Sequence, residues 1–187
     1  TTLFRSIEHC KKVLEIEPLN RDICHRMANF YNFTCSFDNS LIEFRKVLLL
    51  DPKHGQALLD YANTLNMTGS PEIAYEFYQA ISDAGIKSLS VTYNMAYTWK
   101  KFGNYEESIR LCEEVLAQSP DYAPAHFALS TSYLTLGNFT QGWKEYEWRW
   151  RQGLLTERQY KEPLWDGSDL TGKTLFIHAE QGLGDTF

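Results

Sequence analysis

The sequence predicts an all-α protein built as a solenoid of helical hairpins, with a short α/β segment at its C-terminus. Two observations predict the solenoid. Pro18, Pro52 and Pro120 are separated by multiples of 34 residues. Large apolar and small residues recur at the same interval, as Met27, Tyr61, Met95 and Leu129 and as Ala28, Ala62, Ala96 and Ser130. A repeat of this length indicates stacked units that are each too small to bury their own apolar stripe.

The repeat interval divides the chain into successive elements. Residues 1–20 are expected to be the second helix of an incomplete repeat. Complete helical hairpins are then expected at 21–54, 55–88 and 89–122, a degenerate one at 123–153, a linker at 154–173 and the start of an α/β domain at 174–187. In each hairpin a small residue on both helices lets them approach closely, and the matching residues of the second helices are Ser40, Ala74, Ser108 and Gly142.

Residues that end helices fall on the same interval. Gly69, Gly103 and Gly137 are placed to end the first helices in a left-handed conformation, which a glycine adopts without steric cost. Cys35 takes that place in the first complete hairpin. We therefore expect a local loss of stability there, but the same turn.

Over residues 6 to about 153 the chain resembles the tetratricopeptide repeat family, which is defined by this period and these residue types. The resemblance implies a right-handed superhelix in which the first helices line a concave groove. The side chains expected on that groove are Arg26, Asn29, Asn32, Asp60, Asn63, Asn66, Tyr93, Asn94, Tyr97 and Lys100.

The asparagines of this set are the first indication of function, because Asn29 and Asn63 are equivalent and so are Asn32 and Asn66. A primary amide both donates and accepts hydrogen bonds, so a row of amides can hold the backbone of an extended peptide. The groove is similar in this respect to that of the nucleocytoplasmic O-linked N-acetylglucosamine transferase. The alternative is that these asparagines are solvated residues near helix ends.

Composition excludes several functional classes. A net charge of −6 and the lack of a basic stripe argue against a nucleic-acid partner, and no apolar run has the length of a membrane span. Four cysteines without a paired spacing indicate a reduced, cytoplasmic protein. The neighbours His9 and Cys10, like Cys24 and His25, point apart on a helix, so we expect no metal and no cofactor.

The C-terminal segment has a different pattern. Residues Lys173 to Ala179 read as a buried strand that runs into a glycine loop containing Gly182 and Gly184. A strand followed by such a loop is typical of the first unit of a Rossmann-like domain, where the loop approaches a ligand. Taken alone, the loop is weak evidence, since many turns between a strand and a helix need glycine.

The last hairpin, with its YEWRW sequence, and the EQGLGDT loop together resemble bacterial tetratricopeptide proteins that continue into a GT-B glycosyltransferase-like domain related to the heptosyltransferases. The resemblance implies that Asp185 is the base that deprotonates an acceptor hydroxyl, and that Gly182 and Gly184 form the ligand loop. Because the chain starts within a repeat, we expect it to be a fragment of such a protein.

Three functions follow from these observations. The first is an interaction scaffold that binds a peptide or protein segment in the groove and has no enzymatic activity of its own. The second is the acceptor-recruiting part of a nucleotide-sugar-dependent glycosyltransferase, and the third is a scaffold whose GT-B-like half has lost catalysis. A lone strand at Lys173 to Ala179 would have to pair with another edge, which allows self-association.

Overall fold

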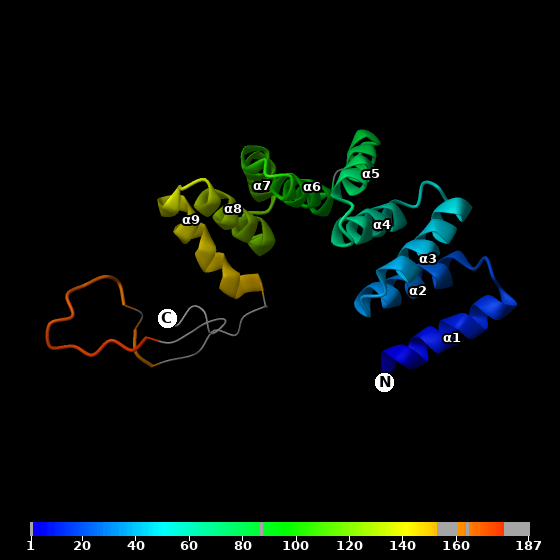
Figure 1. Cartoon of the computed structure of the whole chain (residues 1–187), viewed down its shortest axis with the longest axis horizontal. Coiled ribbons are helices and arrows are strands. Elements are labelled where there is room, and N and C mark those ends of the chain that lie inside the picture. Colours follow the sequence, from blue (N-terminus) through cyan, green and yellow to red (C-terminus); the bar gives the residue numbers. More distant parts are fainter. Residues whose placement is uncertain (1, 87, 153–160, 164, 178–187) are drawn as a thin grey trace. The chain divides into compact units, whose positions relative to one another are not determined.

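The computed structural model describes residues 2–86, 88–152, 161–163 and 165–177. The chain divides into two compact units, 1–155 and 156–187. The first unit holds all the helices of the described residues (Figure 1). They are α1 (Thr2–Ile16), α2 (Arg21–Phe33), α3 (Phe37–Leu50), α4 (Gly55–Met67), α5 (Pro71–Asp83), α6 (Leu89–Lys101), α7 (Tyr105–Gln118), α8 (Ala123–Thr135), α9 (Phe139–Tyr146) and the 3-10 helix η1 (Glu147–Gln152).

The helices pack as successive hairpins, which confirms the predicted helical solenoid. α2 packs on α3, α4 on α5, α6 on α7 and α8 on α9, and each hairpin also contacts the next. Figure 1 shows this succession from α1 to α9. The described residues contain no strand.

Small residues make the close helix crossings, as the interval predicts. Ala28, Ala62 and Ala96 are fully buried within one continuous core. The crossing of α8 and α9 leaves little space, because a Cβ added to Gly142 would lie 2.7 Å from the Leu134 side chain. Gly142 therefore allows α9 to approach α8 more closely than an alanine would.

The helices begin at side-chain caps, and the first helices end at left-handed turns. The side chains of Asn20, His54, Asn104 and Asn138 each accept a hydrogen bond from a backbone N–H in the first turn of the following helix. After the first helices the chain turns through positive φ angles, at Cys35 as well as at the expected glycines. Cys35 has a φ of 57°, so it adopts the left-handed conformation in spite of its Cβ.

The end of the first unit is held by polar contacts as well as by apolar ones. His126 on α8 lies between the Glu145 carboxylate and the Pro120 carbonyl oxygen. The Trp148 ring of η1 stacks on it at 3.7 Å, almost parallel. These contacts fix η1 against α8.

The described part of the second unit is irregular backbone with bends and one turn. Asp166 and Asp169 accept hydrogen bonds from the backbone N–H groups of Ser168 and Thr171. Residues 173–177 form no strand, contrary to the strand predicted over Lys173 to Ala179, whose last two residues lie outside the described ranges. A strand is stable only beside another strand that satisfies its backbone groups, and the described residues contain no strand.

No helix in the described ranges has the length and apolar character needed to cross a bilayer. All four cysteines are free, and Cys35 alone is exposed. Burial raises the pKa of the Cys112 thiol to about 12, so this cysteine acts as a small apolar core residue.

Replacing Cys35 by glycine should stabilise the protein, because glycine adopts the left-handed conformation without the cost of a Cβ. We expect Cys35→Gly to raise the free energy of unfolding by about 1 kcal/mol, measured by urea denaturation. Cys35→Ala is the matched control, since it removes the thiol and keeps the Cβ. Equal stability of the two variants would contradict this explanation.

Candidate functional site

The ten side chains predicted for the groove come from α2, α4 and α6. Some of them make contacts within the protein, and others remain available to a partner. Arg26 and Asn29 are exposed and form no hydrogen bond or ion pair with any described residue. Tyr97 is 37% exposed. The other seven make specific contacts inside the protein, so the predicted face is only partly available to a partner.

Asn32 and Asn66 link neighbouring repeats. The Asn32 amide donates a hydrogen bond of 2.8 Å to the Thr64 hydroxyl, and the Asn66 amide donates one of 2.9 Å to Thr98. Each threonine hydroxyl in turn donates to a backbone carbonyl of its own helix. We call these two contacts the amide brackets. Neither expectation for these asparagines, a peptide ladder or solvated helix ends, describes the contacts that they make.

Asn63 and Asn94 form a second polar group together with Tyr78 of α5. The Asn63 side-chain oxygen accepts a hydrogen bond of 2.7 Å from the Tyr78 hydroxyl and one of 2.6 Å from the Asn94 amide. Burial raises the pKa of Tyr78 to about 12, so the phenol remains a donor at neutral pH. Asn63 is thus occupied, although its equivalent Asn29 is free.

Asp60 and Tyr93 also make contacts within the protein. The Asp60 carboxylate lies 3.0 Å from His25 Nε2 and accepts a hydrogen bond of 2.9 Å from Gln56. The Tyr93 ring packs edge-on against Tyr122, and burial raises the pKa of its hydroxyl. Both residues help to hold successive first helices together.

Two lysines lie in the last turn of α6. The Lys100 and Lys101 ammonium groups lie 5.1 and 5.4 Å from the centre of the Tyr97 ring. Lys100 also donates a hydrogen bond of 3.2 Å to the Thr131 hydroxyl on α8, and Lys101 donates to the backbone oxygen of Asn66. Burial lowers the pKa of Lys100.

Sequence reasoning missed three side chains of this face. Phe33 is 79% exposed and Met67 is 63% exposed, at equivalent last positions of α2 and α4. Lys101 holds the same position in α6. The 34-residue interval could have found Phe33 and Met67, because a large apolar side chain repeated at an outward position is a signal as regular as a repeated asparagine.

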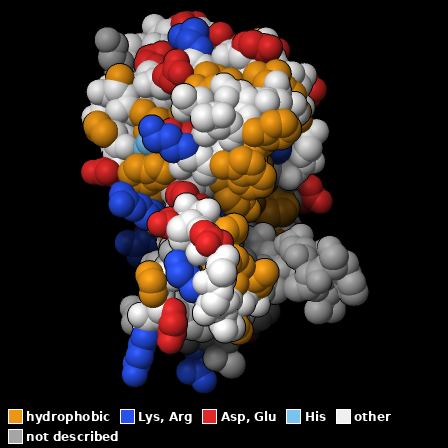
Figure 2. All heavy atoms as spheres, turned by 90° about the vertical axis from the view of Figure 1, so that its left-hand side faces the viewer, with side chains coloured by type: hydrophobic (Ala, Val, Ile, Leu, Met, Phe, Trp, Pro, Cys, Tyr) orange, Lys and Arg blue, Asp and Glu red, His pale blue; other side chains and the backbone are white. Residues whose placement is uncertain are grey.

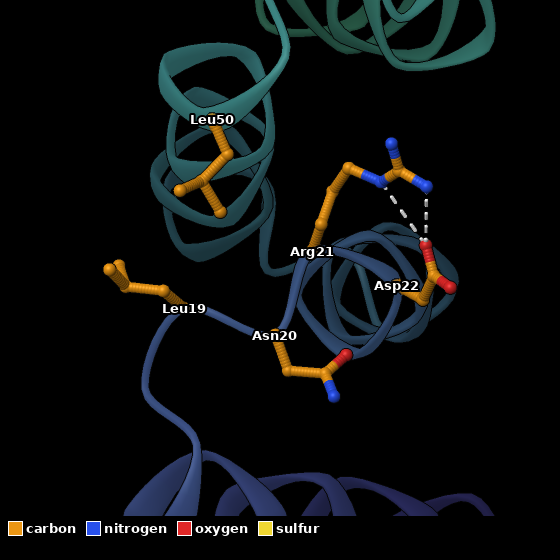
Figure 3. Close-up of a pocket in the computed structure, with 5 residues that line it drawn as sticks. All are labelled: Leu19, Asn20, Arg21, Asp22 and Leu50. Carbon is orange, nitrogen blue, oxygen red and sulfur yellow. Dashed lines mark hydrogen bonds and ion pairs between the residues drawn. The ribbon is translucent and has the colours of Figure 1, made fainter.

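Other features of the described residues are weaker candidates for a functional site. An open depression where α1 is joined to α2 is lined by Leu19, Asn20, Arg21, Asp22 and Leu50 (Figure 3). Its polar groups are already used, because Asn20 caps α2 and Arg21 pairs with Asp22 and Asp51. No three His, Cys, Asp or Glu side chains converge as a metal site within the described ranges.

Hydrophobic side chains are also exposed at the α8–α9 end of the first unit. Leu136, Phe139 and Trp143 are the exposed ones there. Figure 2 views the molecule from this side and shows hydrophobic side chains among charged ones. The predicted ligand-loop residues Gly182 and Gly184 and the predicted base Asp185 lie outside the described residues.

Comparison with solved structures identifies the fold as that of tetratricopeptide repeat proteins. The chain superposes on a tetratricopeptide repeat protein from Parabacteroides merdae with a TM-score of 0.72 and 18% identity, covering 81% of this chain and 59% of that one. It superposes on YrrB, described as a tetratricopeptide protein with an unusual peptide-binding site, with a TM-score of 0.63 and 16% identity over 81% and 78% of the two chains.

Sequence comparison matches only part of the chain. The chain is 38% identical over 98 residues to the protein FlbA of Caulobacter vibrioides, a match that covers 50% of this chain. It spans only 16% of the length of that relative. No family model matches the chain.

The amide brackets should contribute to stability. Thr98→Val keeps the shape of the side chain but leaves the buried Asn66 amide without its acceptor, at a cost of about 1–3 kcal/mol. We expect a corresponding fall in the free energy of unfolding, measured by urea denaturation. Thr135→Val is the control, because its exposed hydroxyl bonds only to its own helix. Parent-like stability of Thr98→Val would show that the bracket contributes nothing.

Proposed function

We propose that this protein is an interaction scaffold that binds an extended peptide segment across the first-helix face of α2, α4 and α6. The observation that carries the proposal is the exposure of Phe33 and Met67 at equivalent positions beside this face. Large apolar side chains that recur in the open at a fixed interval mark interaction sites more often than isolated ones do. The relation to solved tetratricopeptide proteins supports a role in protein interaction.

Chemically, the face offers two kinds of contact. Phe33 and Met67 offer apolar surface for partner side chains, and methionine adapts to differently shaped partners. The free amide of Asn29 offers a donor and an acceptor for a peptide backbone. Asn63, Asn32 and Asn66 are used inside the protein, so we assign them to the support of the face and leave backbone contacts to Asn29.

The proposal is tested with a random nonapeptide library displayed between folded domains, from which peptides that bind the protein are selected. For one selected peptide, Phe33→Ser combined with Met67→Ser should weaken binding at least tenfold, about 1.4 kcal/mol, in fluorescence polarisation. Both side chains are exposed, so the melting temperature should stay nearly unchanged.

The matched control is Leu49→Ser on α3, which removes an apolar side chain that is 82% exposed on a second helix. It should leave the dissociation constant unchanged. A library that yields no binding peptide, or a loss of affinity in the control equal to that of the double variant, would overturn the proposal.

The glycosyltransferase-linked alternative depends on the sequence motif that contains Gly184 and Asp185. In a longer protein that includes this segment, Asp185→Asn should abolish sugar transfer and leave donor binding intact, because a general base acts only on the acceptor hydroxyl. Single-turnover assays with separate measurement of donor binding would check this. Retained transfer would reject Asp185 as the base and leave the glycine loop as a structural turn.

A further inference from the structure

The helix α1 has an open side that the later second helices do not have. α3 packs between α2 and α4, α5 between α4 and α6, and α7 between α6 and α8. α1 packs on α2, the first helix that follows it (Figure 1). On the side where a preceding first helix would pack, α1 and α2 form an open groove, which we call the α1–α2 groove. It is lined by Ser6, Cys10 and Val13 of α1 and by Ile23, Arg26 and Phe30 of α2.

The burial of equivalent residues shows that these places are normally covered. Val13, Ile23 and Phe30 are each only partly buried. The residues at the same places in the next three repeats are at most 3% exposed, and they are Val47, Ile81 and Val115, then Ala57, Val91 and Ala125, then Thr64, Thr98 and Ser132. A cover of the same kind over the α1–α2 groove would remove further apolar surface from water, which favours its binding.

In the next repeat the cover is a first helix, α2 itself. Its contacts there are a hydrogen bond of 2.9 Å from the Ser40 hydroxyl to the Ala28 carbonyl oxygen, one of 2.8 Å from the Asn32 amide to Thr64, and the approach of His25 to Asp60 at 3.0 Å. The places of Ser40, Asp60 and Thr64 are taken in the α1–α2 groove by Ser6, Arg26 and Phe30. The groove therefore matches a helix that lies on α1 as α2 lies on α3.

The charge at one of these places is reversed in the α1–α2 groove. Arg26 stands where Asp60 stands in the next repeat, and it is exposed without an ion pair to any described residue. Arg5 and His9 border the same groove and also have no such pair within the described ranges. An acidic residue at the place of His25 in the covering helix would complement Arg26, whereas a basic one there would bring like charges together.

We propose that the α1–α2 groove binds an amphipathic α-helix of a partner protein, which packs on α1 as α2 packs on α3. The repeat gives the pattern of that helix. It has an acidic residue at the place of His25, a small residue three positions later at the place of Ala28, and a large apolar residue four positions further on, at the place of Asn32. The small residue lets the helix approach Ser6 closely, and the apolar residue covers Phe30.

The described first helices of this chain do not have that pattern. The places equivalent to His25 are held by Leu59, Tyr93 and Phe127, so none of these helices offers an acid to Arg26. Charge complementarity therefore favours a different protein over a second copy as the source of the helix. The site goes beyond the proposed function, because it binds a helix and uses none of the side chains to which that proposal assigns contacts.

The test uses a 13-residue peptide with the α2 sequence, changed by His25→Glu and Asn32→Leu to fit the groove. A peptide of this length is only marginally helical on its own, so it is cross-linked between the places of Asp22 and Asn29, which are exposed in α2. The protein should bind this probe in fluorescence polarisation. Ser6→Leu should weaken binding at least tenfold by filling the place of closest approach. Its melting temperature should stay nearly unchanged, because the groove is open.

A charge exchange then tests the orientation of the helix. Arg26→Glu should weaken binding of the probe at least fivefold, and a second probe with His25→Lys should bind Arg26→Glu at least fivefold more tightly than it binds the wild-type protein. Lys53→Glu is the control, because it makes the same change of charge on an exposed turn outside the groove. The exchange also decides the question should Ser6→Leu fail to fold, since Arg26 is exposed.

Several results would overturn the proposal. One is equal affinity of the probe for the wild-type protein and for a folded Ser6→Leu variant, and another is a charge exchange without reversal of preference. A wild-type dimer in sedimentation velocity that Ser6→Leu dissociates would assign the groove to a second copy instead. Failure of the probe to bind a longer natural form of the chain would assign it to a segment of that form. Binding of the selected nonapeptide should be the same in Ser6→Leu, so the two proposals are tested separately.

Discussion

The close approach of the two helices within each hairpin is the constraint on which the rest of the structure depends. A single hairpin is too small to bury its apolar stripe, so it is stable only when its helices cross closely and the next hairpin covers them. Ala28, Ala62 and Ala96 are fully buried at these crossings, and at Gly142 even one methyl group would contact Leu134 too closely. Because the core uses these positions, the opposite side of each first helix is left for other contacts.

Polar contacts between repeats fix the spacing of the first helices on that side. Asn32 and Asn66 connect α2 to α4 and α4 to α6 through the hydroxyls of Thr64 and Thr98. The exposed ends of the same helices carry Phe33, Met67 and Lys101. A partner that contacts several of them meets side chains whose separation is already set, and such preorganisation reduces the entropy cost of binding.

The sequence predicted the hairpins well because their determinants are local and repeated. The left-handed turn at Cys35 was also predictable, since its place in the repeat requires that conformation whatever the residue. The use of each asparagine was not predictable. Periodicity shows which side of a helix a residue lies on, but the separate uses of Asn29 and Asn63 depend on whether a tyrosine such as Tyr78 reaches them from the neighbouring helix.

The strand expected over Lys173 to Ala179 is not seen in residues 173–177, the part of it that the structure describes, and a related reason applies. Its apolar pattern is a property of the segment, but strand formation depends on a partner edge. Residues 173–177 form no strand in the structure. Helical hairpins depend less on distant residues, because each helix satisfies its own backbone hydrogen bonds.

The groups on the first-helix face are also not uniform. Apolar surface lies at Phe33 and Met67, and cationic charge lies at Lys100 and Lys101 on the following first helix. A uniform row of amides would hold an extended backbone in many registers, since each repeat would offer the same contacts. Apolar groups at one place and cationic groups at another remove that degeneracy, because a segment with complementary groups fits such a face in one register. Specificity of this kind needs few contacts, provided that every wrong register leaves a charge unpaired.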